Sequence, residues 1–328
     1  MRRILVTGSS GYIGNRLAGA LAEKRWVGRI VGVDLAPPRE RHAKFRFVRQ
    51  DVRESVADVM REEGIDTVCH LAWILPPIHD RRLMEDINIR GTEMILSAAA
   101  ETGVSQLLVT SSTTAYGFHA DNDIPLTEES PLRGNDDFAY SKNKKEVERL
   151  MEGFRAAKPG ITCTILRGCF VVGPGFANPL AAHLQKRLVV ISRRTAPFQF
   201  VHEDDFVDVM VMCLEKKIEG IYNVAGEGTI TFDEMIRTLG NVPVRLPYPL
   251  LYLSNNLAWF LRLSFVTEFP STALNLMRWP WIATSGKLVR ETGYRFRYDT
   301  KEAFADFARY VKEKGKEPRP VGRETRDG

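Results

Sequence analysis

The 328-residue chain has few cysteines and only a small excess of positive charge. Its four cysteines (Cys69, Cys163, Cys169 and Cys213) form no Cys-x-x-Cys pair and lack metal-ligand spacing, which predicts reduced, buried thiols and no metal site. The net charge of +5 comes from Lys and Arg interspersed with Asp and Glu, so the pattern argues against nucleic-acid binding. The composition is that of a globular protein, and the chain is long enough for one large domain or for one large and one small domain.

The sequence also lacks a secretory leader and a long hydrophobic run. Residues 1–7 continue directly into a predicted strand, without the apolar core or cleavage site of a signal peptide, so a cytoplasmic location is expected. Residues 249–265 resemble a membrane span, but the stretch is short and is interrupted by Asn255, Asn256 and Arg262. We therefore expect no integral membrane segment and interpret the stretch as an amphipathic helix that covers a pocket. Contact with a membrane surface is the alternative.

Short apolar runs alternate with longer helical patterns through the first half of the chain, which predicts strand–helix–strand units and a parallel sheet. Right-handed crossovers between such units give an α/β fold with a Rossmann-type doubly wound sheet. Strands are expected at residues 3–7, 29–33, 44–48, 67–71, 106–110 and 162–166, and helices at residues 13–24, 82–102, 140–156 and 206–215.

The alternation becomes irregular after about residue 175, where proline is frequent and the predicted strands, 188–192 and 220–224, are isolated. We expect residues 1–175 to form a nucleotide-binding domain, with returns to its sheet near residues 198–225. Residues 176–310 are expected to form a smaller, interleaved substrate-binding region. The charged, Pro- and Gly-rich end, residues 311–328, predicts a flexible tail.

A glycine-rich loop lies at the turn from the first predicted strand to the first predicted helix. Because Gly8, Gly11 and Gly14 carry no side chains, the backbone there can approach a pyrophosphate. The pyrophosphate would sit on the N-terminal amides of the helix, which include those of Tyr12 and Ile13. The position between a strand and an amphipathic helix favours a dinucleotide site over an ordinary turn.

Two acidic positions extend the predicted cofactor site. Asp34 ends the second predicted strand, where a carboxylate accepts hydrogen bonds from the adenosine ribose hydroxyls and repels a 2′-phosphate, so NAD is predicted rather than NADP. Asp51 and Val52 follow the third strand and are expected to meet the adenine edge. An N-cap role for Asp51 is the alternative.

Tyr140 and Lys144 are four residues apart in a predicted helix, so both side chains share one face. An ammonium group there is expected to lower the pKa of the phenol, by its charge and by hydrogen bonding to the phenolate. Ser112, beyond the fifth predicted strand, lies at the carboxyl edge of the sheet, where its hydroxyl can bind the substrate oxygen. Together with the nucleotide site, these residues predict hydride transfer at a carbon that bears oxygen.

The order of glycine loop, Asp34, Ser-rich strand end and Tyr-x-x-x-Lys resembles the extended short-chain dehydrogenase/reductases, the NAD-dependent epimerase/dehydratase family, over about residues 1–310. Further matches are residues 70–72, 88–92, 166–167, 173–175, 202–205 and 222–225. The resemblance implies NAD as cofactor, Ser112 as the catalytic Ser/Thr, Tyr140 as the acid/base and Lys144 as a ligand of the nicotinamide ribose.

The same resemblance adds three residues near the cofactor and an oligomeric state. Leu71 and Ala72 are implied at the cofactor, and Asn88 is implied behind the nicotinamide and the substrate. The family also implies a homodimer built from two helices of each subunit, here residues 82–102 and 140–156.

Three departures from sugar-nucleotide members of the family bear on the substrate. Thr113 and Thr114 follow Ser112, where 4,6-dehydratases typically carry Asp-Glu, so dehydration is disfavoured. Phe170 stands where many nucleotide-sugar enzymes carry an Asn that holds the substrate phosphates. Phe198 stands where those enzymes often place an Arg on the diphosphate. We expect Thr113 and the aromatic residues to line the substrate pocket.

An apolar pocket is therefore predicted, with ordinary core packing as the alternative for any one of its aromatic residues. The candidates are Trp73, Ile74, Leu75, Phe170, Phe198, Trp259 and Trp279. The leading interpretation is an NAD-dependent alcohol dehydrogenase or carbonyl reductase that acts on a relatively apolar small molecule. The alternative is a nucleotide-sugar 4-epimerase with tightly held NAD, in which Arg193 and Arg194 replace the missing diphosphate contact. A third possibility, a non-catalytic NAD-binding scaffold, is disfavoured by the intact Ser112, Tyr140 and Lys144.

Overall fold

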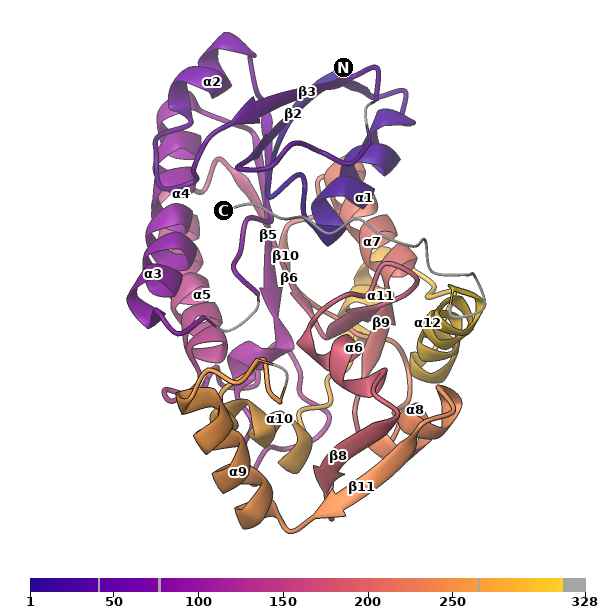
Figure 1. The fold of residues 1–328 in the computed structure, drawn as a ribbon. Helices are drawn as coiled ribbons and strands as arrows, with labels where there is room; N and C mark the ends of the chain where they lie inside the picture. The colour runs from indigo at the N-terminus through magenta and orange to yellow at the C-terminus, as the bar shows by residue number, and fades with distance from the viewer. Residues whose placement is uncertain (41, 76–77, 265, 315–328) are drawn as a thin grey trace, which may run out of the picture.

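A seven-stranded parallel sheet organises the structure, a computed structural model that describes residues 1–40, 42–75, 78–264 and 266–314 (Figure 1). The strand order β10-β6-β5-β4-β1-β2-β3 confirms the predicted doubly wound α/β fold. The strands are β1 (Arg2–Thr7), β2 (Val27–Asp34), β3 (Phe45–Arg49), β4 (Thr67–His70), β5 (Gln106–Ser112), β6 (Thr162–Gly168) and β10 (Gly220–Val224).

Helices cover both faces of this sheet, as the alternating pattern predicted (Figure 1). One face packs against α1 (Tyr12–Ala22), α7 (Glu203–Lys216) and α11 (Gly286–Thr292). The other packs against α2 (Ala57–Glu62), α4 (Gly91–Thr102) and α5 (Ala139–Ala157). The central strands are mainly apolar because side chains on both faces are buried; in β1, for example, residues 4–6 are fully enclosed, whereas β3 at the edge of the sheet carries Arg46 and Arg49 and is only partly buried.

The predicted helix over residues 82–102 consists of three segments. α3 (Arg81–Glu85) leads into a π-helical turn, η1 (Asp86–Arg90), and α4 follows. The turn holds Asn88 fully buried, with its Oδ1 atom accepting a hydrogen bond from the Ile74 amide at 2.9 Å. Such π-turns are frequent at functional sites because they redirect side chains that a regular helix would place elsewhere.

The second half of the chain forms a smaller lobe and also returns to the main sheet (Figure 1). The segment between β6 and β10 contains β7 (Phe170–Val172), α6 (Pro179–Leu184), β8 (Leu188–Ser192), β9 (Phe200–His202) and α7. Later elements are α8 (Phe232–Thr238), β11 (Val242–Leu246), α9 (Tyr248–Phe260), η3 (Ser271–Leu274), α10 (Asn275–Arg278) and α12 (Thr300–Lys314). β7 pairs with β9, and β8 pairs with β11. The last residues of α12 replace the start of the predicted flexible tail, and residues 315–328 lie outside the described part.

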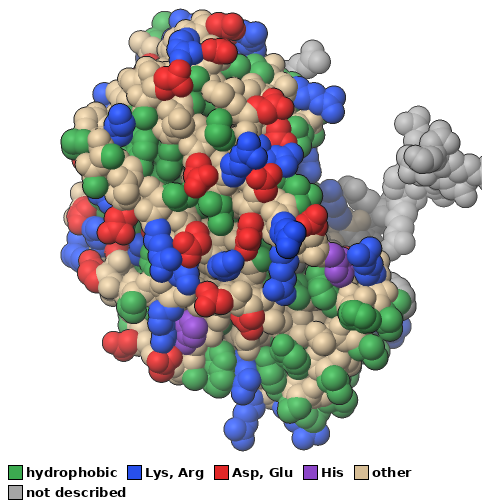
Figure 2. Space-filling view, turned by 90° about the vertical axis from the view of Figure 1, so that its left-hand side faces the viewer, with side chains coloured by type: hydrophobic (Ala, Val, Ile, Leu, Met, Phe, Trp, Pro, Cys, Tyr) green, Lys and Arg blue, Asp and Glu red, His purple; other side chains and the backbone are tan. Residues whose placement is uncertain are grey.

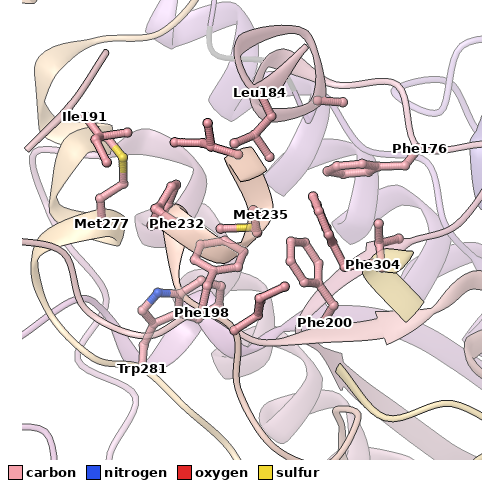
Figure 3. Packing of buried hydrophobic residues seen from close by; sticks show 14 of the residues in the cluster. Phe176, Leu184, Ile191, Phe198, Phe200, Phe232, Met235, Met277, Trp281 and Phe304 are labelled. Carbon is pink, nitrogen blue, oxygen red and sulfur yellow. The ribbon is translucent and has the colours of Figure 1, made fainter. Parts of the chain in front are cut away.

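An aromatic core fills the smaller lobe (Figure 3). The ring of Phe198 is fully buried, with its centre 5.0 Å from the rings of Phe170 and Phe200 and 5.3 Å from that of Trp281. Its backbone also pairs with Ile230 in both directions. Phe198 is thus a core residue rather than a pocket-lining one, because other rings enclose it on all sides. Burying such a side chain contributes about 1.5–3 kcal/mol to stability.

Candidate active site

The glycine loop between β1 and α1 depends on the absence of side chains. A Cβ atom on Gly14 would lie 2.0 Å from the carbonyl oxygen of Gly8, and one on Gly8 would lie 2.7 Å from the amide nitrogen of Ala72. Gly8 also has a φ of +68°, which favours glycine. The loop is therefore packed against the end of β4, next to the predicted cofactor residues Leu71 and Ala72.

The N-terminus of α1 is available to an anion. Gly11 is its N-cap and provides no side-chain cap, and the first turn contains no acidic residue. The first intrahelical hydrogen bond runs from the Asn15 amide to the Gly11 carbonyl, 3.0 Å, so the amides of Tyr12, Ile13 and Gly14 precede it. These three donors at the positive end of a helix suit a pyrophosphate.

Asp34 lies beside this loop at the end of β2. Its Oδ2 atom accepts a hydrogen bond from the Ser10 amide at 3.0 Å, and its Oδ1 atom accepts one from the Ala36 amide at 3.2 Å. These bonds hold the carboxylate at the carboxyl edge of the sheet, where a dinucleotide ribose lies in this fold.

Asp51 pairs with Arg53 and does not cap a helix. Its carboxylate accepts hydrogen bonds from the amide and guanidinium of Arg53, which hold its pKa below the usual range. α2 begins only at Ala57, with Val56 as its N-cap, so the N-cap alternative is wrong. Val52 is buried against Gly91 of α4, and contact of Asp51 or Val52 with adenine stays a prediction.

Asn88 provides a buried donor for a ligand. Its Nδ2 atom is enclosed and has no hydrogen-bond partner among the described residues. Because an unpaired buried amide costs about 1–3 kcal/mol, a polar group from a ligand would stabilise the site. The open helix N-terminus, the loop that excludes side chains and this unpaired amide fit a bound dinucleotide.

The predicted catalytic residues come together at the carboxyl edge of the sheet. Ser112 ends β5, and Tyr140 lies in the first turn of α5, where the Ser112 hydroxyl is near enough to lower the pKa of the phenol. Lys144 lies on the next turn, and its Nζ atom donates to the Thr110 carbonyl at 2.9 Å. The Ser112 hydroxyl also accepts a bond from the Thr114 amide at 3.2 Å, which fixes its position.

Burial dominates the acid–base properties of the two α5 residues. It raises the pKa of Tyr140 to about 12, with the neighbouring Ser112 hydroxyl opposing the shift, and lowers the pKa of Lys144 to about 7, with the charge of Glu148 opposing the shift. The expected lowering of the Tyr140 pKa by Lys144 is therefore absent from this structure. The reason is geometric: the Lys144 Nζ atom lies 5.9 Å from the centre of the Tyr140 ring and is directed to other partners.

Trp73 is the main one of those partners. The Lys144 Nζ atom lies 3.5 Å from the centre of a Trp73 ring, a cation–π contact, and the Trp73 and Tyr140 rings meet edge to face at 6.0 Å. Trp73 was predicted to line the substrate pocket, and it lies within the catalytic group. Thr113, also predicted there, is fully buried, with its Oγ1 atom 3.5 Å from the Gly168 carbonyl.

A buried polar network behind Ser112 was not predicted from the sequence. Arg167 on β6 forms two 2.8 Å hydrogen bonds to Glu148 on α5, and a third of 2.8 Å to the hydroxyl of Tyr116. Ser111 donates to Glu148 at 2.5 Å, and Tyr116 donates to Asn223 at 2.8 Å. The sequence does contain one indication of this network: Glu148 is four residues after Lys144 and therefore lies on the same face of the helix.

Two hollows lie on the substrate side of these residues. A small one of about 30 Å³ reaches Tyr140 and is lined by Met84, Phe138 and Trp259, among others. A larger one of about 680 Å³ lies between α6 and the end of α9 and is mainly apolar, with lining that includes Ala177, Pro179, Ala182, Trp259, Thr267 and Glu268. The ring of Trp259 stacks on that of His79 at 3.9 Å, and both rings line both hollows.

The comparison with protein families decides the identity of the chain. Residues 4–225 match the family described as the NAD dependent epimerase/dehydratase family. The chain belongs to this family. Its relatives include an uncharacterized protein of Mycobacterium tuberculosis, 26% identical over 315 residues, which cover 93% of this chain and 83% of the relative. UDP-glucose 4-epimerase 1 of rice is 27% identical over 201 residues, 56% of this chain and 53% of the relative.

Solved structures of epimerase/dehydratase-type proteins share the fold over nearly the whole chain. MoeE5 in complex with UDP-glucuronic acid and NAD has a TM-score of 0.75 at 21% identity, covering 95% of this chain and 99% of that one. UDP-glucose 4-epimerase of Thermotoga maritima with UDP-glucose has a TM-score of 0.73 at 18% identity, with the same coverage. At these identities the likeness establishes the fold.

Proposed function

We propose that this epimerase/dehydratase family member transfers hydride between NAD and a secondary alcohol or ketone. The observation that carries the proposal is the convergence of Ser112, at the end of β5, and Tyr140, in the first turn of α5, at the carboxyl edge of the sheet, with Lys144 on the next turn. Bound NAD supplies the hydride acceptor or donor. Asp34 would hold the adenosine ribose, and its charge favours NAD over NADP.

In the oxidative direction Tyr140 takes the hydroxyl proton of the alcohol. The Ser112 hydroxyl holds the same substrate oxygen, so the proton moves along a short path to the phenol oxygen. For this step the Lys144 ammonium has to turn from the Thr110 carbonyl and Trp73 toward the phenol oxygen, where its charge would stabilise the phenolate. In the reductive direction Tyr140 returns the proton to the carbonyl oxygen.

The substrate we propose is relatively apolar. The hollow beside Tyr140 is bordered by Met84 and Phe138 and also by the charged Arg81 and Asp137, whereas the larger cavity is mainly apolar. Phe170 occupies a position where nucleotide-sugar enzymes carry a phosphate-binding Asn. Binding energy at such a surface comes from burial of hydrocarbon rather than from charge-assisted hydrogen bonds.

A nucleotide-sugar 4-epimerase is the second candidate. It is supported by the likeness to enzymes solved with UDP-sugars and by the exposed Arg193 and Arg194 directly after β8, which could meet a diphosphate. In that case the keto intermediate would turn over and take hydride back on its other face.

Replacing Tyr140 with Phe tests the chemistry. Tyr140→Phe removes the proton carrier, so turnover should fall by at least ~100-fold, while NAD affinity changes little because the ring remains. Steady-state kinetics and NAD titration measure the two effects. Tyr310→Phe on α12 is the matched control and should keep full activity. A Tyr140→Phe variant with near-native turnover would refute the assignment.

Cofactor exchange distinguishes the two candidate functions. A dehydrogenase must release its reduced cofactor in each cycle, whereas an epimerase regenerates NAD in place. We expect isotopically labelled NAD to exchange into the purified protein within a single turnover time. If NAD is retained until the protein is denatured, the epimerase is the correct function.

A further inference from the structure

The outer face of α9 is an exposed hydrophobic stripe. The helix carries no Asp, Glu, Lys or Arg in its thirteen residues. At about 100° per residue, five large apolar side chains fall within about 100° of the helix circumference. They are Leu250, Leu253, Leu257, Phe260 and the following Leu261, which are 53%, 67%, 58%, 79% and 53% exposed. The opposite face holds the buried Leu251, Asn255 and Ala258.

Such a surface is unusual for a helix in contact with water. Water-facing helix surfaces normally carry charges, and contiguous apolar patches mark sites of association with another surface. Hydrophobic side chains gather at the lower right of Figure 2, on the part of the molecule that α9 forms in Figure 1, and Lys and Arg side chains lie at the edge of that cluster. The stripe is therefore a candidate docking surface.

Positive charge surrounds the stripe. Residues 179–194 and 242–279, which contain α9 and the elements next to it, include seven Lys or Arg and Glu268 as their single acidic residue, a net charge of +6; one of the seven, Arg245, is paired with Asp233 of α8. The whole chain has a net charge of +5, so the remainder carries −1. Lys186 lies against the end of the α9 segment, with its Nζ atom 3.4 Å from the Val266 carbonyl. A partner for this face is expected to be apolar and negatively charged.

A second copy of the chain fits this surface less well than an anionic lipid layer. A two-fold dimer through α9 would bring two net-positive regions together, and their repulsion would oppose association. Anionic lipid headgroups attract Lys and Arg, and the acyl boundary below them accepts Leu and Phe side chains.

The stripe also borders the larger cavity, and this position gives docking on a lipid layer a function. Trp259 on α9 and Arg262 just after it line the 680 Å³ cavity, so the stripe lies at the border of that cavity. Trp259 also lines the small hollow that reaches Tyr140. A molecule that leaves a lipid layer beside α9 would thus be next to a cavity that shares His79 and Trp259 with the hollow at Tyr140.

We propose that α9 docks on an anionic lipid surface, with its stripe at the acyl boundary and the surrounding Lys and Arg on the headgroups. Docking would place the cavity against the lipid layer, from which an apolar alcohol or ketone enters; this second part rests on the proposed function. No helix among the described residues is long and apolar enough to cross a membrane, so the contact is peripheral.

Flotation with lipid vesicles tests the docking without NAD or substrate. The full chain should bind vesicles of equal parts phosphatidylglycerol and phosphatidylcholine, and bind pure phosphatidylcholine at least ~10-fold less, because each basic residue at an anionic surface contributes on the order of fivefold. Leu253→Ser/Leu257→Ser should weaken binding at least ~10-fold through lost burial. Leu35→Ser/Val289→Ser, which removes two exposed apolar side chains away from α9, should bind as the wild type does.

The results separate docking from catalysis. Circular dichroism and thermal unfolding verify that each variant folds. A wild-type chain that does not float with anionic vesicles overturns the proposal. Equally decisive is a concentration-dependent dimer that Leu253→Ser/Leu257→Ser abolishes, which would assign the stripe to self-association. Because vesicle binding is measured without turnover, an inactive Tyr140→Phe variant should still float, and the two proposals fail independently.

Discussion

Among single residues, Lys144 shows how burial disfavours the charged form of a side chain whose proposed role requires that charge. Its side chain is 3% exposed, enclosed by Trp73 and the Thr110 carbonyl, and its pKa falls to about 7. At neutral pH the protonated and neutral forms are thus close in free energy. A small change near the ammonium, such as a bound cofactor hydroxyl, would be enough to alter its protonation.

This depressed pKa predicts a dependence of stability on pH. The folded-state pKa of about 7 lies below the ordinary value of 10.5, so between these values the unfolded chain binds the extra proton. The free energy of unfolding therefore rises with pH over this window, by up to ~1.4 kcal/mol per pH unit from Lys144. Lys144→Met should remove this contribution to the slope, measured by urea unfolding at pH 7, 8 and 9.

The control for this prediction is two residues away. Lys142 is 38% exposed and pairs with Glu85, which raises its pKa, so Lys142→Met should leave the slope over pH 7–9 unchanged. Equal slopes in wild type and Lys144→Met would contradict the assignment of a depressed pKa to Lys144.

Among the elements, β5, α5, β6 and β10 are joined by the network of Ser111, Glu148, Arg167, Tyr116 and Asn223. Glu148 and Arg167 are 3% and 4% exposed, so their charges depend on each other rather than on water. Because Ser112 and Tyr140 stand on two of these elements, the network holds the two proposed catalytic residues in position from behind.

Replacing only Arg167 of the Arg167–Glu148 pair should lower the free energy of unfolding more than replacing both residues. Arg167→Met leaves the Glu148 carboxylate buried and unpaired, which we expect to destabilise the fold by ~3–5 kcal/mol. Arg167→Met/Glu148→Leu should recover much of that loss, because no charge remains buried. Denaturant unfolding of the three proteins tests this. A double variant less stable than Arg167→Met alone would show that the network contributes in another way.

The sequence predicted elements with a strong periodic signal and missed features that depend on tertiary contacts. The parallel strands and the shared face of Tyr140 and Lys144 follow from local spacing. The π-turn at Asn88 does not, because a 3.6-residue period cannot reveal one inserted residue. The burial of Phe198 and the direction of the Lys144 side chain depend on rings from distant segments, which single-sequence patterns do not bring together.

At the scale of the whole molecule, the arrangement of α4 and α5 bears on assembly. They lie side by side on one face of the sheet (Figure 1), as the predicted homodimer requires. Gly153 on the outer side of α5 has open space around it, which would allow a partner helix to approach closely. The stripe on α9 is a separate surface, so dimer formation and lipid docking are compatible.

A bulky charge on this face tests the homodimer. Light scattering after gel filtration should give twice the chain mass for the wild type, and Gly153→Arg should give the monomer because the side chain would occupy the helix interface. Gly160, in the loop after α5, has equally open surroundings, so Gly160→Arg is the control and should remain dimeric. A dimeric Gly153→Arg protein would place the interface elsewhere.

The chain returns to the main sheet through β10, and this affects both folding during synthesis and the behaviour of truncated fragments. β10 pairs with β6 along five residues, after an excursion of about fifty residues through the smaller lobe. Until β10 arrives, β6 is an open edge whose unpaired amides and carbonyls can recruit strands of other molecules. A fragment that ends at residue 175 would keep that edge exposed and tend to aggregate. The main sheet is therefore complete only when the later half of the chain has been synthesised.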